Sequence, residues 1–456
     1  MPMLYDHSPV KGCEALCRDI QKRICDGNCR IVDLLDEKER TGERPEVFRE
    51  EGGELRTGQY VGLFEYEGNQ VTIASRFDRE NPKPFFLWYL IENFLGESII
   101  SPENLGSACQ KSLFDELLAV RLAVQVQQAW RKGGLRAYQS FRRNDSRASG
   151  VIDVARHIRE NLELENGRMA YRMQIYSLNN QWNVLFLQAS AAARQRFPDL
   201  MRRLERRLPE YSAALRTLTQ AVPGWEESKL RQVLDRTERT ITNPVYRDWE
   251  GVRRAARSVL RRMGVKPGES GPSSVTGVFL DIDRLWERLL EKKLFCGAKL
   301  PYAQQSRLVL NGHMVIRPDF YFPSGKTVLD AKNRSVWEDT LAPVDRAVME
   351  NVPGRGKKGS PEGKWSEMVA PPNAVRDNVY QVLSYMLVLD CFRGGVVFPT
   401  HICHDPVCDP IGPRDLDFWR IPVCIPRAEK YCDFQELFGK EFLRLRSQDP
   451  VCRIVT

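Results

Sequence analysis

Three charged residues stand in two strand-like segments of the last third of the chain. Asp319 is the one acid in the apolar and aromatic run at 314–322, and Asp330 and Lys332 close a second run at 326–332. Side chains alternate along a strand, so Asp330 and Lys332 project to one face. Two buried carboxylates and an ammonium are costly unless they hold a cation and act on an anion. The pattern therefore predicts a metal-dependent phosphodiester hydrolase.

The string itself, Pro318-Asp319 followed by Asp330-Ala331-Lys332, is a weak signal because such residues often combine by chance. The turn at 323–325 joins both segments into a hairpin and makes the signal more specific. The alternative is an edge hairpin whose charges are solvated. The apolar residues on both sides of the charges favour burial instead.

Neighbouring segments must position these charges. Residues 277–290 have a helical period, with Glu287 at the flank of its apolar stripe. A second helix is expected at 373–390, in which Gln381 and Tyr385 are four residues apart and share a face. A strand follows that helix. The order of helix, strand, hairpin strands, helix and strand predicts an α/β core.

These segments together resemble the PD-(D/E)xK nuclease superfamily and, within it, the McrC family, the nuclease subunit of McrBC-type modification-dependent restriction systems. The family's FLFDMNxLFExxV helix is similar to residues 279–287. Its RPD and LDxK strands match 317–319 and 329–332, and its YQxxxY helix matches 380–385. Fainter similarity extends the resemblance to about residue 55, at residues 60–63, 179–183 and 243–246.

The expected mechanism uses Mg²⁺, with Mn²⁺ as an alternative. Asp319, Asp330 and the carbonyl of Ala331 are expected to coordinate it, because hard cations prefer oxygen ligands. Glu287 would contribute through a metal-bound water. The metal would activate a water molecule and steady the leaving oxygen.

Three further residues complete the expected site. Lys332 would orient the attacking water or offset charge in the transition state. Gln381 and Tyr385 would bind the phosphate or position the lysine, and the alternative for both is a supporting structural role. One departure from the family is Asn333-Arg334, which stands where an aromatic residue usually follows the lysine.

The chain contains no Gly-x-x-x-x-Gly-Lys-Ser/Thr loop, so we do not expect it to hydrolyse nucleotides. The resemblance implies an AAA+ GTPase partner of the McrB type, a hetero-oligomer, and DNA as substrate. The N-terminal region would dock on the partner's ring and stimulate it. Two alternatives stay open: a non-catalytic adaptor of an AAA+ partner, and a stand-alone structure-specific repair nuclease.

The fold class expected is α/β and multidomain. We expect an N-terminal α+β partner-docking region at 1–135, a mostly helical, arginine-rich region at 136–266, a linker at 267–274, and a PD-(D/E)xK restriction-endonuclease-like α/β domain at 275–456. Within the last, the basic segment at 340–372 either closes over DNA or is a surface insertion. The N-terminal region carries a hairpin signal that turns at Glu67-Gly68-Asn69, followed by helical periods.

Composition is that of an ordinary globular protein, with 456 residues, 42% hydrophobic and 28% charged. No apolar run reaches membrane-spanning length and no signal-peptide core opens the chain, so we expect a cytoplasmic protein without membrane contact. The net charge is +8. Arginines cluster at 194–207 and 253–262, where they either track phosphates, form a solvated helix face or line a subunit interface.

Twelve cysteines in a cytoplasmic chain do not predict disulfides. A zinc site is conceivable but disfavoured at Cys13, Cys17, Cys25 and Cys29, because zinc ribbons and fingers usually begin with shorter gaps. A second cluster, at His401, Cys403, His404 and Cys408, is a weaker candidate still.

Overall fold

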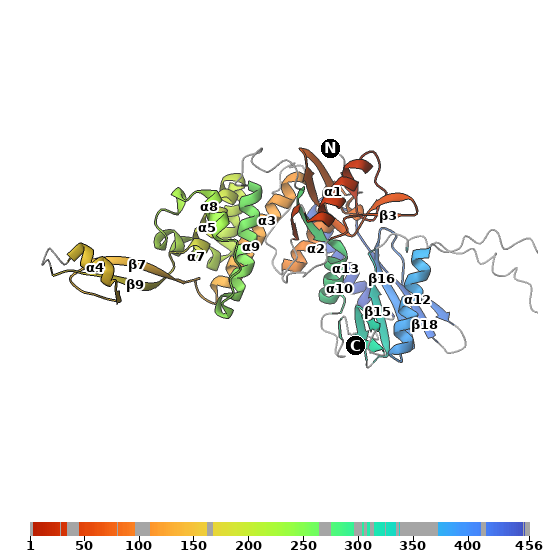
Figure 1. Cartoon of the computed structure of the whole chain (residues 1–456). Helices are drawn as coiled ribbons and strands as arrows, with labels where there is room; N and C mark the ends of the chain where they lie inside the picture. The colour runs from red at the N-terminus through yellow and green to blue at the C-terminus, as the bar shows by residue number, and fades with distance from the viewer. Residues whose placement is uncertain are drawn as a thin grey trace, which may run out of the picture.

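The protein is described by a computed structural model of the whole chain (Figure 1). It describes residues 3–27, 29–33, 45–79, 81–95, 110–161, 167–263, 275–295, 303–304, 308–310, 314–323, 325–333, 337, 373–411, 416–449 and 451. The expected linker at 267–274 and the whole segment at 340–372 lie outside the described residues. No helix in the described ranges is long and apolar enough to cross a bilayer.

The N-terminal unit is built on a five-stranded sheet in the order β1-β6-β5-β10-β2 (Figure 1). Its strands are β1 (Met3–Tyr5), β2 (Cys29–Asp33), β5 (Tyr60–Tyr66), β6 (Asn69–Ala74) and β10 (Val275–Asp281). Helix α1 (Glu14–Asp26) and the hairpin of β3 (Phe48–Glu51) and β4 (Glu54–Thr57) pack beside it. The expected hairpin of β5 and β6 is confirmed, and Glu67 and Gly68 take the positive φ angles that its tight turn requires.

Strand β10 corrects the helix expected at 277–290. Residues 275–281 are extended because they pair with β5 on one side and β2 on the other, more than 200 positions away in sequence. The helix begins only at Ile282, as α10 (Ile282–Lys293), and Asp281 caps it by accepting a hydrogen bond from the Arg284 N–H. The apolar stripe predicted for the helix itself is confirmed as buried.

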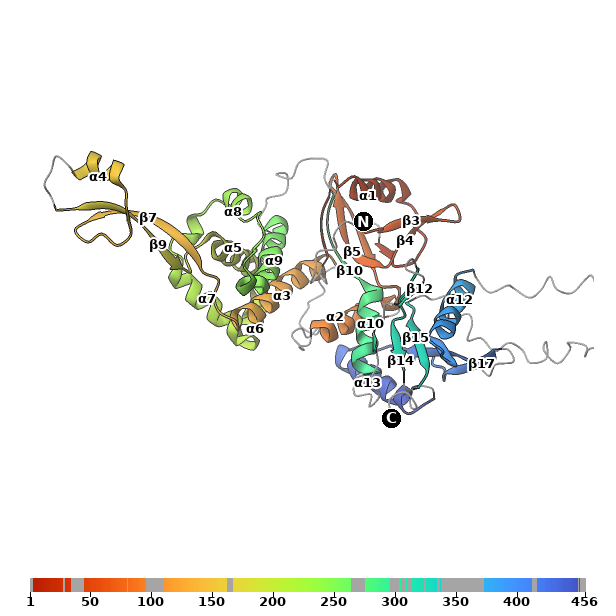
Figure 2. The same ribbon diagram turned by 60° about the horizontal axis from the view of Figure 1, so that its bottom comes forward.

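The middle region is a helical bundle with a projecting arm (Figures 1 and 2). Its helices are α3 (Gln110–Trp130), α5 (Gln181–Arg196), α6 (Pro198–Arg207), α7 (Pro209–Ala221), α8 (Leu230–Arg236) and α9 (Arg247–Met263). Helix α2 (Phe85–Leu95) lies outside this bundle and packs beside α10. The arm is a three-stranded sheet with one short helix, made of β7 (Ala137–Asp145), β8 (Val151–Ile152), α4 (Val154–Asn161) and β9 (Met169–Ser177). Sequence periodicity missed this sheet because β7 is largely exposed and has no buried face to alternate with.

The C-terminal unit has a six-stranded sheet in the order β11-β14-β15-β16-β18-β17. Its strands are β11 (Ala303–Gln304), β14 (Phe320–Phe322), β15 (Thr327–Ala331), β16 (Arg393–Thr400), β17 (Val407–Ile411) and β18 (Leu416–Cys424). Helix α12 (Asn373–Val388) covers one face, where it packs on Val328 and Val396. Helices α10 and α13 (Tyr431–Arg446) belong to the core on the other face, with Leu329 and Val397 (Figure 2). The mixed α/β class is confirmed.

The single strand expected at 314–322 is divided in two. Strand β13 (Met314–Ile316) pairs with β12 (Leu308–Leu310) in a separate two-stranded sheet, while β14 pairs with β15. Arg317 and Pro318 interrupt the run, and a proline cannot donate the backbone hydrogen bond that a continuous ladder would need.

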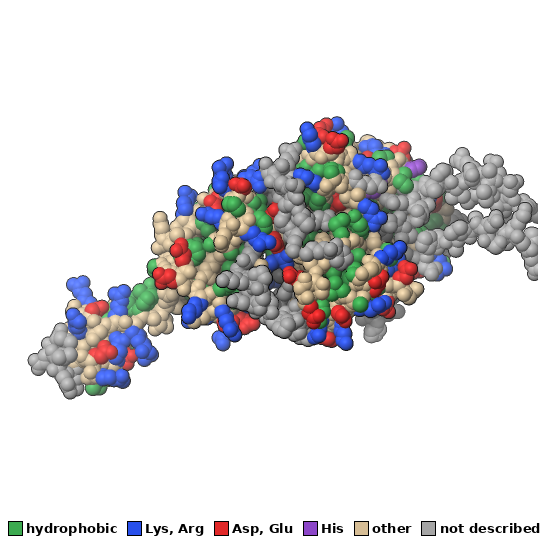
Figure 3. Space-filling model, turned by 90° about the horizontal axis from the view of Figure 1, so that it is seen from above, with side chains coloured by type: hydrophobic (Ala, Val, Ile, Leu, Met, Phe, Trp, Pro, Cys, Tyr) green, Lys and Arg blue, Asp and Glu red, His purple; other side chains and the backbone are tan. Residues whose placement is uncertain are grey.

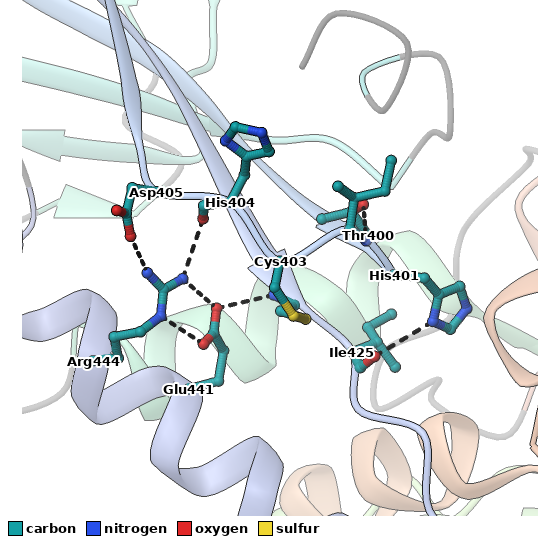
Figure 4. The surroundings of a disulfide bond; sticks show 10 residues. Thr400, His401, Cys403, His404, Asp405, Ile425, Glu441 and Arg444 are labelled. Atoms are coloured by element: carbon teal, nitrogen blue, oxygen red, sulfur yellow. Dashed lines mark hydrogen bonds and ion pairs between the residues drawn. A yellow bond between two sulfur atoms is a disulfide. The ribbon is translucent and has the colours of Figure 1, made fainter. Parts of the chain in front are cut away.

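One disulfide contradicts the expectation of none. Cys403 is bonded to Cys424 at the end of β18 (Figure 4). The parallel pairing of β16 with β18 places Thr400 opposite Cys424, so the chain leaving β16 passes beside that cysteine. Glu441 accepts a hydrogen bond from the Cys424 N–H and also pairs with Arg444 (Figure 4). Cys403 is thereby removed from the second cluster of possible metal ligands.

Candidate active site

The antiparallel pairing of β14 with β15 brings the two aspartates together. Phe320 is paired with Leu329, and Asp319 and Asp330 are the next residues outward on their strands. The Asp319 Oδ2 atom accepts a hydrogen bond of 2.8 Å from the Ala331 N–H. The two carboxylates therefore meet at the end of the hairpin ladder.

Lys332 lies beside Asp330, as strand alternation predicted. Its Nζ atom is 2.6 Å from the Asp330 Oδ2 atom, and the side chains are 17% and 3% exposed, respectively. The backbone N–H of Lys332 donates to the Val397 carbonyl at 2.9 Å, which keeps the lysine in register with β16. The ammonium is thus held at the site by both its charge partner and its backbone.

Helix α12 adds two polar side chains on the same side. Lys332 Nζ donates to the Gln381 Oε1 atom at 3.1 Å, and Gln381 Nε2 donates to the Tyr385 hydroxyl at 2.6 Å. Burial and then the charge of Asp330 raise the pKa of Tyr385. The structure therefore assembles these residues into one hydrogen-bonded chain that ends on the lysine.

The carboxylates repel one another. Burial raises the pKa of Asp319 well above its ordinary value, and the like charges of Asp330 and then Glu287 raise it further. The hydrogen bond from Ala331 acts in the opposite direction. Glu287, from α10, thus acts electrostatically on the hairpin pair. The sequence-predicted residues are brought together from three elements, the hairpin, α10 and α12.

Such repulsion is the electrostatic condition that a bound cation relieves. No three His, Cys, Asp or Glu side chains within the described ranges form a complete metal-binding group by themselves. The donors that fit are the two hairpin carboxylates and the Ala331 carbonyl, with water filling the remaining positions. This set suits Mg²⁺, which is bound through one or two carboxylates and keeps several waters.

The four N-terminal cysteines are not gathered in this way. The Sγ atoms of Cys13, which precedes α1, and of Cys17, within it, are 3.7 Å apart, and Cys17 is buried. Cys25 is exposed and accepts a hydrogen bond from the Gln21 amide. None of them belongs to a metal-binding group among the residues described.

The arginine cluster of α9 has a structural explanation that composition did not reveal. Arg253 and Arg257 are each only 7% exposed. Arg253 donates to the carbonyls of Thr237 and Glu238, and Arg257 donates to that of Leu234, so both satisfy the C-terminal end of α8. Exposed basic side chains remain on α6 and on the arm (Figure 3).

Sequence analysis missed one set of residues next to the site. Asn333, the residue after Lys332, is 2% exposed and contacts both the N-terminal unit and α10. Its position was visible in the sequence, but its partners are 50 and 257 residues away, and no local pattern indicates them.

Comparison with known proteins finds a family model and similar solved structures. The family model described as McrBC 5-methylcytosine restriction system component matches residues 55–347. A refined half-complex from a tetradecameric assembly of Thermococcus gammatolerans McrB AAA+ hexamers with bound McrC is similar at a TM-score of 0.54 and 15% identity, over 98% of this chain and 99% of that chain. The cryo-EM structure of the Thermococcus gammatolerans McrBC complex gives a TM-score of 0.35 at 17% identity, over 65% of this chain and 87% of that chain. No curated protein matches.

Proposed function

Since this chain belongs to the McrBC family of 5-methylcytosine restriction system components, we propose that it is the nuclease subunit, a Mg²⁺-dependent endodeoxyribonuclease of the PD-(D/E)xK type. The observation that supports this most is the convergence of Asp319, Asp330 and Lys332 at one end of a hairpin. A structural hairpin has no need of two carboxylates whose repulsion raises a pKa, together with an ammonium, in a largely buried position.

Each residue has a role in the proposed hydrolysis. Asp319, Asp330 and the Ala331 carbonyl would hold Mg²⁺, which supplies a polarised phosphate oxygen and a more acidic water. Lys332 is held 2.6 Å from Asp330 and donates to Gln381. From this position its ammonium would orient the attacking water or offset the charge that develops on the phosphate. Glu287 lies near enough to influence Asp319 and would act through a water molecule.

We further propose that the chain works with an AAA+ GTPase of the McrB type. The similar solved structure contains McrB AAA+ hexamers with bound McrC. The sequence placed the docking surface in the N-terminal region, 1–135. We place a further partner surface on the arm, residues 137–177, because it projects from the bundle and exposes large apolar side chains (Figures 1 and 3). These are Tyr138, Phe141, Val151, Ile152, Val154, Ile158 and Tyr176.

The test is a cleavage assay with the full chain, Mg²⁺, GTP and the partner GTPase, on 5-methylcytosine-containing and unmodified duplex DNA. Asp319→Ala, Asp330→Ala and Lys332→Ala should each abolish cleavage and leave the stimulation of GTP hydrolysis near wild type. If Asp330→Ala still cleaves fully after EDTA treatment and return of Mg²⁺, the assignment of these residues as the active site is wrong. Stimulation without cleavage by the wild-type protein would favour a non-catalytic adaptor. Nucleotide-independent cleavage by the chain alone would favour a stand-alone nuclease.

A further inference from the structure

A partly buried polar network joins the N-terminal unit to the residue that follows Lys332. Asn333 donates from Nδ2 to the Asp283 Oδ1 atom at 2.9 Å, and its backbone carbonyl accepts from the Arg76 Nη2 atom at 2.6 Å. Asn333 is 2% exposed. The chain is therefore fixed one residue after Lys332 by groups from two other elements.

The N-terminal side of the network is itself anchored. Arg76, in the short 3₁₀ helix Arg76–Asp78, pairs with Asp6: its backbone N–H donates to Oδ1 at 2.6 Å and its Nη1 atom lies 3.2 Å from Oδ2. The Asp6 side chain is fully buried. A guanidinium held in this way keeps its Nη2 group aimed at the Asn333 carbonyl.

The α10 side is anchored by the same unit. His7 Nε2 lies 3.3 Å from the Asp283 Oδ1 atom. Burial alone would raise the pKa of Asp283, but the hydrogen bonds from His7 and Asn333 and the charge of Arg76 bring that pKa below its ordinary value. Asp283 therefore remains an ionised acceptor. It is also one turn before Glu287, on the same face of α10.

Adhesion between the units does not require this network. Both contribute to one continuous hydrophobic core, in which Phe85 and Phe86 of α2 contact Phe434 and Phe438 of α13. A buried ionic network adds little to stability compared with apolar packing, and its strength is in fixing geometry. Here the fixed groups are the chain beside Lys332 and the turn of α10 that precedes Glu287.

We propose that Asn333, held between Arg76 and Asp283, is a positioning residue for Lys332 and Glu287, so that the N-terminal unit sets the geometry of the cleavage site. This rests on the proposed function, because it assigns a control to the same site. Residues that orient an active site in this way typically change activity or metal affinity by about 10–100-fold when they are removed.

The primary variant is Asn333→Ala in the full chain, assayed with the partner GTPase. Its matched control is Asn81→Ala, since Asn81 also joins the two units, by accepting a hydrogen bond of 3.2 Å from the Ala428 N–H, but does not contact β15 or α10 in that bond. We expect kcat to fall at least tenfold for Asn333→Ala with an unchanged KM for DNA. The control should keep wild-type kcat. Equal losses in both variants, or a kcat for Asn333→Ala within about twofold of wild type, would overturn the proposal.

A charge-balanced swap tests geometry directly. Asn333→Asp alone places two carboxylates face to face, and Asp283→Asn alone places two amides face to face. Together, these substitutions restore an N–H donor opposite a carboxylate, and we expect the double variant to recover most of the lost kcat. A double variant that is folded by its thermal midpoint, yet no more active than the single variants, contradicts positioning.

Metal binding separates this proposal from the proposed function. Mn²⁺ binding to the full chain without DNA can be measured by electron paramagnetic resonance. Asn333→Ala should raise the Mn²⁺ dissociation constant about tenfold, and Asn81→Ala should leave it unchanged. If the wild-type protein binds Mn²⁺ but never cleaves DNA, the proposed function is wrong and the positioning role can still be judged from the Mn²⁺ affinities. Equal Mn²⁺ affinity in both variants and wild type, together with unchanged cleavage, rejects the positioning role.

Discussion

Neutralising one carboxylate of the site should stabilise the metal-free protein while it abolishes cleavage. Asp319→Asn keeps an oxygen acceptor for the Ala331 N–H and removes a charge that Asp330 and Glu287 both oppose. Two like unit charges in close contact repel by about 4 kcal/mol at an effective dielectric constant of about 20. Lys332 already offsets part of this through its contact with Asp330. We therefore expect a gain of about 2 kcal/mol, or about 2 °C in the thermal midpoint of a chain this long.

The opposite change provides the matched comparison. Lys332→Met leaves Asp330, whose side chain is 3% exposed, without its cation. Breaking a buried ion pair on one side costs about 3–5 kcal/mol, and the 17% exposure of the lysine side chain favours the lower end of that range. Two inactive variants of one site should thus shift stability in opposite directions, which general damage to the site cannot produce.

The effect of Asp319 on the free energy of unfolding depends on pH, and the sign of that dependence follows from its raised pKa. Its folded-state pKa is raised, so the stability that its protonated form contributes is complete below the ordinary carboxyl pKa. That stability is lost as pH rises through the raised pKa. The advantage of Asp319→Asn over wild type should therefore grow with pH, being small at pH 5 and largest at pH 8.

Thermal unfolding in EDTA at both pH values, followed by Mg²⁺ titration at pH 8, measures these effects. Wild type should be stabilised by Mg²⁺, and Asp319→Asn should lose most of that response because it lacks a ligand charge. An Asn variant that is less stable than wild type in EDTA at pH 8 would refute the reasoning, because the carboxylates would then not be in repulsive contact.

Three other predictions concern the rest of the chain. Val151 and Ile158 have exposed side chains on the arm, so Val151→Glu and Ile158→Glu should weaken stimulation of the partner's GTP hydrolysis but change the free energy of unfolding by less than about 0.5 kcal/mol. The control is Leu443→Glu on α13, where the side chain is also exposed; in the same GTPase titration it should stimulate the partner as wild type does. Fragment 275–456 should aggregate when expressed alone, because β10 loses both of its partner strands and the aromatic residues of α13 lose their contacts with α2. Co-expression with fragment 1–263 should restore soluble protein, as measured by gel filtration. Arg253→Ala should cost about 2–4 kcal/mol in denaturant unfolding, since it leaves buried carbonyls without their donor and removes one of the cations that pair with Glu250. Exposed Arg206→Ala should cost less than about 0.5 kcal/mol.

The parts of the site that the sequence predicted are those set by local geometry. Strand alternation places Asp330 beside Lys332, and helical spacing places Gln381 beside Tyr385; both contacts are present. The hairpin turn then fixes which residue of β14 meets β15. These relations join residues that are two, four and twelve positions apart, so periodicity and turn chemistry are sufficient to predict them.

What could not be predicted depends on contacts between distant segments. Nothing in 277–281 distinguishes the first turns of an apolar helix from a strand until β5 and β2 are in place on either side. From the sequence, the arginines of α9 suggested an exposed basic face, because charge does not reveal whether a guanidinium faces solvent or the carbonyls of another helix. Burial of polar groups is decided by tertiary partners, which a single sequence does not display.

Strand β10 connects the N-terminal sheet directly to the helix that carries Glu287. After the helical bundle the chain returns to the N-terminal sheet, and Asp281, the last residue of β10, is also the cap of α10. Gln59 holds this junction through both its side chain, which donates to Asp281, and its carbonyl, which accepts from the Ile282 N–H. The helix that carries Glu287 thus starts from a position set by the N-terminal sheet. A displacement of that sheet would move α10 and, through Arg76, the chain beside Lys332, so the N-terminal unit and the proposed active site are connected at two points.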